Sequence, residues 1–160
     1  MSERNIDVTR LVKHVTVASS VLSIFPILFT SLTLTQDQLL ASIPLIFLIA
    51  VLHEAMHVLA LRVLGLRFRI SLSPTLVAVK ILNVLTYRDY VITALSPQTI
   101  TATLLVIYVL HHSNLMLLLS IVHIFMSSLD VAMCIYLYRY RMYRFKICED
   151  DCGRILITIV

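Results

Sequence analysis

The stretch LLASIPLIFLIAVLHEAMHVLAL, residues 39–61, decides the class of this protein. Glu54 is the only residue in it that carries a formal charge, and apolar side chains fill nearly all the other positions. A helix needs about 20 mostly apolar residues to cross the hydrocarbon core of a bilayer. We therefore expect residues 39–61 to form a transmembrane helix.

The composition of the whole chain leads to the same class. Of its 160 residues, 59% are hydrophobic and 14% are charged, and the mean hydropathy is +0.94. Soluble domains average about 45–50% apolar and about 25% charged residues. A soluble protein of this size has too little interior for the surplus of apolar side chains. These values exclude a soluble globular enzyme and favour a multi-pass membrane protein.

Three other apolar stretches are long enough to span a bilayer: residues 15–34, 90–110 and 115–137. The first follows basic residues, as the apolar region of a signal peptide does, but it is too long and ends without a small-x-small cleavage site. It is therefore interpreted as a retained helix. The sequence predicts an all-α membrane protein with four transmembrane helices, and residues 1–160 are expected to form a single membrane-embedded domain.

The lysines and arginines predict how the four spans are oriented. Three precede the first span, five lie between the second and third, five follow the fourth, and the short loops at 35–38 and 111–114 have none. All 13 therefore lie on one side, which the positive-inside rule assigns to the cytoplasm. We expect a multi-pass protein of the cell membrane, surrounded by the lipid bilayer, with both termini and the tail at 138–160 in the cytoplasm.

The segment between the second and third spans contains the clearest strand pattern. Apolar and other side chains alternate from Leu66 to Leu72, and Pro74 separates this run from a second one that ends at Leu82. Alternation on both sides of a turn residue is typical of a β-hairpin. We expect a short hairpin over residues 66–82 at the inner face of the membrane, after a helix C-cap at Gly65. One more strand is expected within residues 154–160.

Charge and cysteine content exclude some functions and leave others open. The net charge is +4, but no basic run with interleaved aromatic residues is present, so nucleic acid is not an expected partner. Cys148 and Cys152 lie close enough in sequence to form a disulfide or half of a metal site. Ordinary thiols are the simpler interpretation, because three cysteines do not make a disulfide framework.

The candidate site begins with His53-Glu54-Ala55-Met56-His57, an HExxH motif in the second span. On a helix the two histidines lie one turn apart on the same face and can bind one metal ion. Glu54 lies beside them and can hold and deprotonate a water molecule. Because carboxylates are costly inside a membrane, each one there is a functional candidate. Glu54 is therefore the predicted catalytic residue.

Asp130, in the fourth span, is the predicted third ligand, because catalytic zinc sites usually have three protein donors. His53 lies nine residues before Arg62, and Asp130 lies nine residues before Arg139. Both are therefore about 13 Å from the basic residue at the same membrane face. If the two helices are in contact, Asp130 reaches the level of the histidine pair. The predicted cofactor is Zn²⁺, held by His53, His57 and Asp130.

Structural explanations for the same residues stay open. The motif residues can form a hydrogen-bonded polar cluster without a metal, and Asp130 can be a helix-packing residue. His123 lies about 10 Å from Asp130 along the helix axis, too far to bind the same ion. It is a candidate for contact with the substrate or the oxyanion, or else an interior histidine with satisfied hydrogen bonds. Ser127 is a second candidate for the oxyanion or substrate contact.

These features together resemble the putative zincin peptidase family of prokaryotic multi-pass membrane proteins, which is similar to the site-2 intramembrane metalloproteases. The resemblance covers roughly residues 39–160 and includes Pro97 early in the third span and the tail stretch Asp150-Asp151-Cys152-Gly153. It implies zinc ligation by the two histidines and Asp130, with Glu54 as general base. It also implies hydrolysis of peptide bonds in membrane proteins or peptides.

One departure from the larger superfamily concerns the third ligand. That superfamily usually carries Asn-Pro-Asp-Gly there, whereas this chain has Ser127-Ser128-Leu129-Asp130. The resemblance therefore leaves the source of oxyanion stabilisation open.

The expected function is that of a zinc-dependent intramembrane metalloprotease. A substrate helix must unwind before cleavage, and the hairpin offers a strand edge with which the unwound segment can pair. A zinc-binding membrane protein without hydrolysis, a scaffold or pseudoprotease, is the main alternative, although such a protein need not keep Glu54. An ion transporter that uses Glu54 and Asp130 as a relay is disfavoured, because the polar residues are concentrated at one depth.

Overall fold

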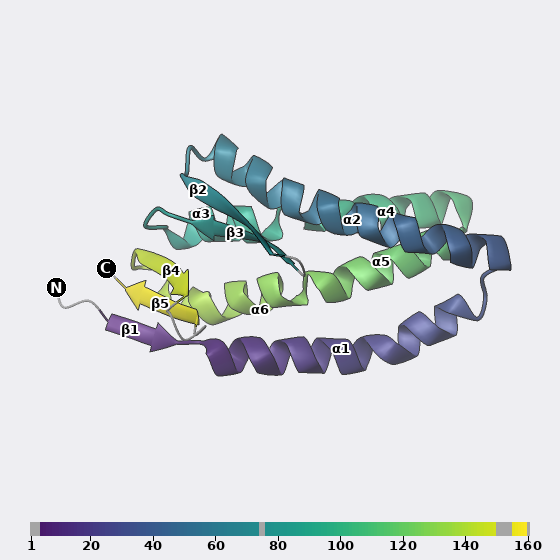
Figure 1. Cartoon of the computed structure of the whole chain (residues 1–160), viewed down its shortest axis with the longest axis horizontal. Coiled ribbons are helices and arrows are strands. Elements are labelled where there is room, and N and C mark those ends of the chain that lie inside the picture. The colour runs from purple at the N-terminus through teal and green to yellow at the C-terminus, as the bar shows by residue number, and fades with distance from the viewer. Residues whose placement is uncertain (1–3, 74–75, 150–154, 160) are drawn as a thin grey trace.

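The computed structural model describes residues 4–73, 76–149 and 155–159, and this part of the chain is mostly helical (Figure 1). The helices are α1 (Thr9–Ser31), α2 (Gln36–Val63), α3 (Tyr87–Leu95), α4 (Gln98–His111), α5 (Asn114–Met126), α6 (Ser128–Leu137) and the short 3₁₀ helix η1 (Tyr138–Tyr140). The strands are β1 (Arg4–Asp7), β2 (Phe68–Ser73), β3 (Leu76–Ile81), β4 (Phe145–Glu149) and β5 (Ile155–Ile159).

Four helical segments of the described chain are long and apolar enough to cross a membrane: Thr9–Ser31, Gln36–Val63, Tyr87–His111 and Asn114–Tyr140. This confirms the predicted number of spans. The helices begin before the predicted spans. The difference is clearest for α1, which starts at Thr9 and so includes Arg10 and Lys13, ahead of the apolar stretch. Large side chains such as Phe25 and Phe47 are 78% and 73% exposed, as expected of helices that face lipid.

The third and fourth spans are each divided into two helices, which the sequence analysis did not predict. The third breaks between α3 and α4 at Ser96 and Pro97, since proline lacks the N–H that a continuous helix requires. The fourth breaks between α5 and α6 at Ser127, whose φ and ψ of −88° and 3° depart from helical values. The Ser127 hydroxyl donates to the carbonyl oxygens of His123 and Ile124, a bond pattern that bends helices.

The predicted hairpin is present as β2 and β3, which pair antiparallel from Phe68↔Ile81 to Ser73↔Leu76. Gly65 has a positive φ of 66°. It ends α2 through two bonds, from Gly65 N to Arg62 O (3.0 Å) and from Leu66 N to Leu61 O (2.9 Å), the C-cap arrangement that favours glycine. β2 runs obliquely back from the end of α2 toward the level at which α5 meets α6, and β3 returns from there (Figure 1).

A second sheet, of order β1-β5-β4, joins the two ends of the chain. Only its β5 strand was expected. β1 pairs with β5 from Arg4↔Ile159 to Asp7↔Leu156, and a bridge between Leu85 and Phe145 connects the sheet to the start of the third span. The fold is therefore helical with two small sheets. Whether Cys148 and Cys152 are ordinary thiols, a disulfide or half of a metal site is a question that lies outside the residues and side chains that the structure describes, as does the stretch at 150–153.

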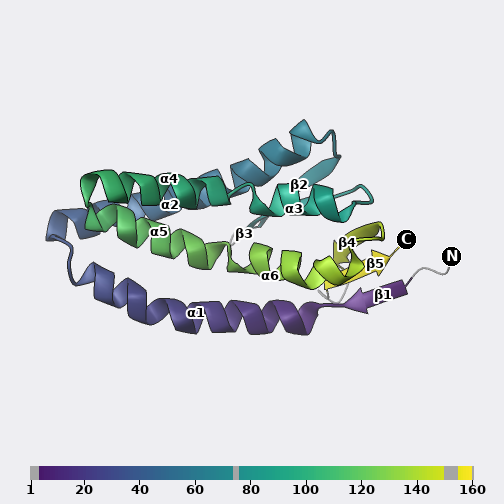
Figure 2. The ribbon, with the colours of Figure 1, turned by 180° about the vertical axis from the view of Figure 1, so that it is seen from behind.

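Two apolar clusters hold the helices together on either side of one polar layer. Ile49, Leu104 and Leu119 form one cluster. The other, beneath the three-stranded sheet, is made of Val8, Leu85, Met133, Leu137, Phe145 and Ile157. α1 packs on α5 and α6, away from α2 (Figures 1 and 2), with a 2.6 Å hydrogen bond between the hydroxyls of Ser19 and Ser128. His53 follows Ile49 by one turn, and Asp130 precedes Met133 by one turn, so the polar layer contains the candidate site.

Candidate metal centre

The HExxH motif lies in α2, where the helix brings its two histidines together. The Nε2 atoms of His53 and His57 are 3.2 Å apart, and the ring planes meet at 83°. Side chains four residues apart on a helix lie on the same face. His53 is buried and His57 is half-buried, so both face the interior of the bundle.

Asp130 reaches the same point from α6. Its Oδ2 atom is 3.3 Å from His53 Nε2 and 3.6 Å from His57 Nε2. The three residues form a group whose donor atoms all lie within 4.8 Å of one another. The predicted equal depth of Asp130 and the histidine pair is therefore observed, although their role as ligands remains a prediction.

The spacing of these donors fits a zinc ion. In a tetrahedral site, metal–nitrogen and metal–oxygen distances of about 2.0–2.1 Å place neighbouring donors about 3.3–3.4 Å apart. The three observed separations, 3.2, 3.3 and 3.6 Å, match one face of such a tetrahedron. Two imidazoles and one carboxylate are also a donor set that zinc accepts, and three protein donors leave the fourth position for water or substrate.

The broken third span orients His57. The His57 Nδ1 atom is 2.9 Å from the carbonyl oxygen of Thr93 in α3. In a continuous helix this carbonyl would accept from the N–H of residue 97, but residue 97 is proline and has none. Because a carbonyl can only accept, His57 carries its proton on Nδ1, and Nε2 presents its lone pair to Asp130 and His53. Pro97 thus frees the group that orients a candidate ligand.

His53 is oriented by another histidine. Its Nδ1 atom lies 3.2 Å from Nε2 of His123 in α5, and the two rings meet edge to face with centroids 5.2 Å apart. His123 is completely buried, and its Nδ1 atom is 2.6 Å from the Thr101 hydroxyl in α4. Both ring nitrogens of His123 therefore have protein partners, which favours a supporting role over contact with a substrate.

The break in the fourth span places Asp130 in the first turn of α6. The N-terminus of a helix carries a partial positive charge and stabilises a carboxylate nearby. Ser127, the other candidate for oxyanion contact, is buried, and its hydroxyl donates to carbonyl oxygens of its own span. The structure therefore brings His123 to the donor group and places Ser127 at the helix break.

Glu54 lies next to the donor group and is half-buried. Within the described part of the chain it makes no hydrogen bond or ion pair. A carboxylate without a protein partner beside three metal donors is free to hold a water molecule by hydrogen bonding. Its position is consistent with the predicted role as general base.

Sequence reasoning missed Thr93, Gln98 and Thr101, which support the two histidines. These residues act through a backbone carbonyl and neutral side chains. Threonine and glutamine are too common in helices to be recognised as functional in a single sequence. Pro97 was the available signal, because a proline within a span frees the carbonyl four residues before it.

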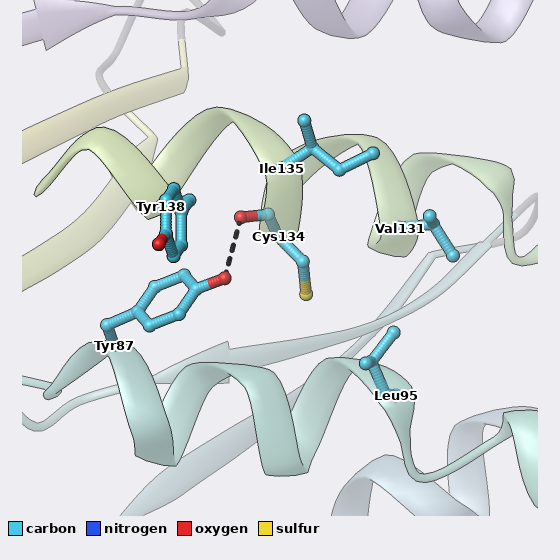
Figure 3. Close-up of a pocket in the computed structure, with 6 residues that line it drawn as sticks. All are labelled: Tyr87, Leu95, Val131, Cys134, Ile135 and Tyr138. Carbon is cyan, nitrogen blue, oxygen red and sulfur yellow. Dashed lines mark hydrogen bonds between the residues drawn. The ribbon is translucent and has the colours of Figure 1, made fainter. Parts of the chain in front are cut away.

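An apolar hollow of about 380 Å³ lies between α3 and α6 (Figure 3). Leu95 from α3 and Val131 and Cys134 from α6 point into it, and the Tyr87 hydroxyl donates to the carbonyl oxygen of Cys134 over 3.2 Å. Val131 and Cys134 follow Asp130 within about one turn. The six side chains that line the hollow carry no formal charge, so the surface that follows Asp130 along α6 is apolar.

Comparison with known proteins identifies the family. The family model described as putative zincin peptidase matches residues 46–144, more than half of the chain. The chain belongs to this family. The matched region of this zincin peptidase family member contains the HExxH motif, Pro97, His123 and Asp130. No curated protein and no solved structure matches the chain. Membership supports metallopeptidase activity and implies a metal ion, for which His53, His57 and Asp130 are the candidate donors.

Proposed function

We propose that the protein is a zinc-dependent intramembrane metallopeptidase that hydrolyses peptide bonds of membrane proteins or peptides. One observation carries the proposal. The Nε2 atoms of His53 and His57 and the Oδ2 atom of Asp130 meet at tetrahedral spacing, beside the carboxylate of Glu54, which has no hydrogen-bond or ion-pair partner among the described residues. Membership in the zincin peptidase family supports the same reaction.

The residues divide the reaction between them. Zinc, when bound, polarises the scissile carbonyl and makes a water molecule easier to deprotonate. His53, His57 and Asp130 would hold the ion, and the partners at Nδ1 of the two histidines fix the direction of their Nε2 atoms. Glu54 takes the proton from the water and delivers it to the nitrogen of the leaving amine. The apolar helices around the site exclude bulk water, which strengthens each of these electrostatic interactions.

The site lies inside the apolar spans, which supports cleavage within the membrane. His53 and His57 belong to α2, and Asp130 belongs to the fourth span. The positive-inside rule favours a cytoplasmic location for the end that carries the basic residues, and we propose that both termini lie in the cytoplasm. We propose a cell-membrane location on the strength of the apolar spans. We also propose prokaryotic relatives and a relation to the site-2 proteases, on the strength of the HExxH motif in the second span and an aspartate in the fourth, although the residues before Asp130 depart from that superfamily's Asn-Pro-Asp-Gly.

The hairpin is the proposed docking element for an unwound substrate. The amide of Leu82 donates to the carbonyl oxygen of Arg67, and hydrogen-bonded pairs alternate along an antiparallel ladder. With the observed register, the backbone N–H groups of Ile70 in β2 and Val77 in β3 point away from the partner strand. Such outward groups can pair with an extended peptide by β-augmentation.

Loss of the Glu54 carboxylate tests the proposed function. We expect Glu54→Gln to keep about one zinc per chain and to slow cleavage by about 10²–10⁴-fold, the usual contribution of a general base. Zinc is measured by elemental analysis, and cleavage is measured on labelled single-span peptides in lipid vesicles. Asp37→Asn, which removes a carboxylate from the first turn of α2, is the matched control and should cleave normally.

The outcomes separate the proposal from its alternative. If the unaltered protein binds zinc but cleaves none of the peptides, and Glu54→Gln changes nothing, a zinc-binding scaffold or pseudoprotease replaces the peptidase. If the unaltered protein binds no zinc, both functions are rejected.

A further inference from the structure

A chain of hydrogen bonds crosses the molecule from α4 to the candidate metal centre. The Thr101 hydroxyl donates to Gln98 Oε1 over 3.2 Å and is 2.6 Å from His123 Nδ1. His123 Nε2 is in turn 3.2 Å from His53 Nδ1. Four side chains on three helices are therefore connected in series, and the last of them is a candidate ligand.

The first acceptor fixes the direction of the whole chain. The Gln98 carbonyl oxygen can only accept, so the single proton of the Thr101 hydroxyl is directed to it. The Thr101 oxygen must then accept from His123, which places the His123 proton on Nδ1. Neutral His123 consequently has a lone pair on Nε2, and this lone pair accepts the Nδ1 proton of His53. The Nε2 lone pair of His53 is left to face Asp130 and His57.

We propose that Gln98, Thr101 and His123 are positioning residues that hold His53 in its Nδ1-protonated form, so that Nε2 is the atom available to a metal. The inference rests on the proposed zinc binding. His57 needs no such chain, because its Nδ1 atom meets a backbone carbonyl that can only accept. The partner of His53 is another histidine, which can either donate or accept. The direction of the His53–His123 hydrogen bond must therefore be set by Thr101 and Gln98.

Burial makes the chain necessary. The exposed fractions of His53, Thr101 and His123 are 6%, 8% and 0%. Water is therefore not available to replace a lost partner, and a buried polar group without a partner is costly. A break at any point lets His53 exchange its two tautomers. In the wrong tautomer the proton is on Nε2, where it blocks the donor atom.

Removal of the Thr101 hydroxyl tests the chain at a residue that does not touch the donor group. We expect Thr101→Val, nearly the same shape, to weaken zinc binding about 10–100-fold, the usual effect of losing an outer partner of a metal ligand. Thr101→Ser keeps the hydroxyl and should restore the affinity. Thr103→Val removes an exposed hydroxyl of the same helix, which donates to the Thr99 carbonyl, and should have no effect. Affinity is measured by competition with a chromophoric chelator, and thermal unfolding in detergent verifies that each variant is folded.

A double-variant cycle shows whether the residues act in series. His123→Phe keeps the ring and removes both nitrogens, so it should weaken zinc binding at least as much as Thr101→Val does. In the His123→Phe background, Thr101→Val should then cost nothing more, because the chain is already broken. Independent, additive losses would contradict the inference.

The histidine tautomers provide a second readout, which does not require zinc. In metal-free protein with ¹⁵N-labelled histidine, we expect His53 to be protonated on Nδ1 and to become a mixture of tautomers in Thr101→Val. An unchanged His53 spectrum in that variant, or unchanged zinc affinity, overturns the inference while leaving the proposed function intact. Absence of zinc binding by the unaltered protein rejects the proposed function, and the tautomer measurement still decides the role of the chain.

Discussion

The Nδ1 atoms of the two motif histidines have different kinds of partner. Different substitutions are therefore expected to change the orientation of each ring. His57 bonds to the Thr93 carbonyl, whereas His53 bonds to His123. The motif itself and Asp130 could be predicted from the sequence, because charged and metal-binding residues are rare in a membrane span. Thr93 and Thr101 could not, since their hydroxyl and carbonyl groups acquire a role only through contacts between helices.

Asp130 is the residue whose predicted role is most directly open to test. We expect Asp130→Asn to weaken zinc binding by more than the roughly 10–100-fold that loss of an outer partner costs, because a neutral amide is a poorer donor than a carboxylate. The measurement is chelator competition on purified protein. Asp37→Asn at the other end of α2 is the control. Equal zinc affinity in Asp130→Asn and the unaltered protein would remove Asp130 from the ligand set.

Among the elements, the two broken spans position the residues of the candidate site. α3 and α4 separate at Pro97 and thereby release the Thr93 carbonyl for His57. α5 and α6 separate at Ser127, which starts a new helix just before Asp130. Span number and approximate position followed from hydropathy alone. The breaks did not, because hydropathy averages over a window and carries no information about which backbone carbonyl loses its partner.

Restoring the missing amide of the third span should weaken the metal site. In Pro97→Ala, the new N–H of residue 97 can donate to the Thr93 carbonyl and compete with His57 Nδ1. We expect zinc affinity to fall about tenfold or more, as for other outer partners, while thermal stability is kept or increased. Pro26→Ala in α1 is a matched control, because that proline lies in a helix that supplies no donor to the group. Unchanged zinc affinity in Pro97→Ala would contradict this account of His57.

The hairpin makes a separate prediction about substrates. Val77→Pro and Ile70→Pro each remove one outward backbone N–H, from β3 and β2 respectively, and proline is tolerated best at such edge positions. We expect one of the two to reduce cleavage of the single-span peptides several-fold, through a higher KM and with zinc content unchanged. Normal cleavage by both variants would reject docking on either edge.

On the scale of the whole molecule, the polar layer connects the helices at a level between the two apolar clusters. α2 packs on α3 and α5, and α6 packs on α3 and α1, while His53 and His57 meet Asp130 directly across the layer. The sheet that joins β1 to β5 and β4 was not predictable in full. β1 lies far from β4 and β5 in sequence, and these short strands gain stability only from pairing and from burial of Phe145 and Ile157.

Zinc bound across this layer should therefore stabilise the entire bundle. A ligand that binds only the folded state stabilises it by about 2.7 kcal/mol when its concentration is 100 times Kd. We expect zinc to raise the Tm of metal-free protein in detergent, and EDTA to reverse the rise. The rise should vanish in His57→Ala, which removes one donor from α2, and persist in a variant with His111→Ala and His112→Ala, whose histidines lie at the opposite end of α4 from Pro97. A rise that depended on His111 and His112 and survived His57→Ala would place the stabilising ion in the loop between α4 and α5 and not between α2 and α6.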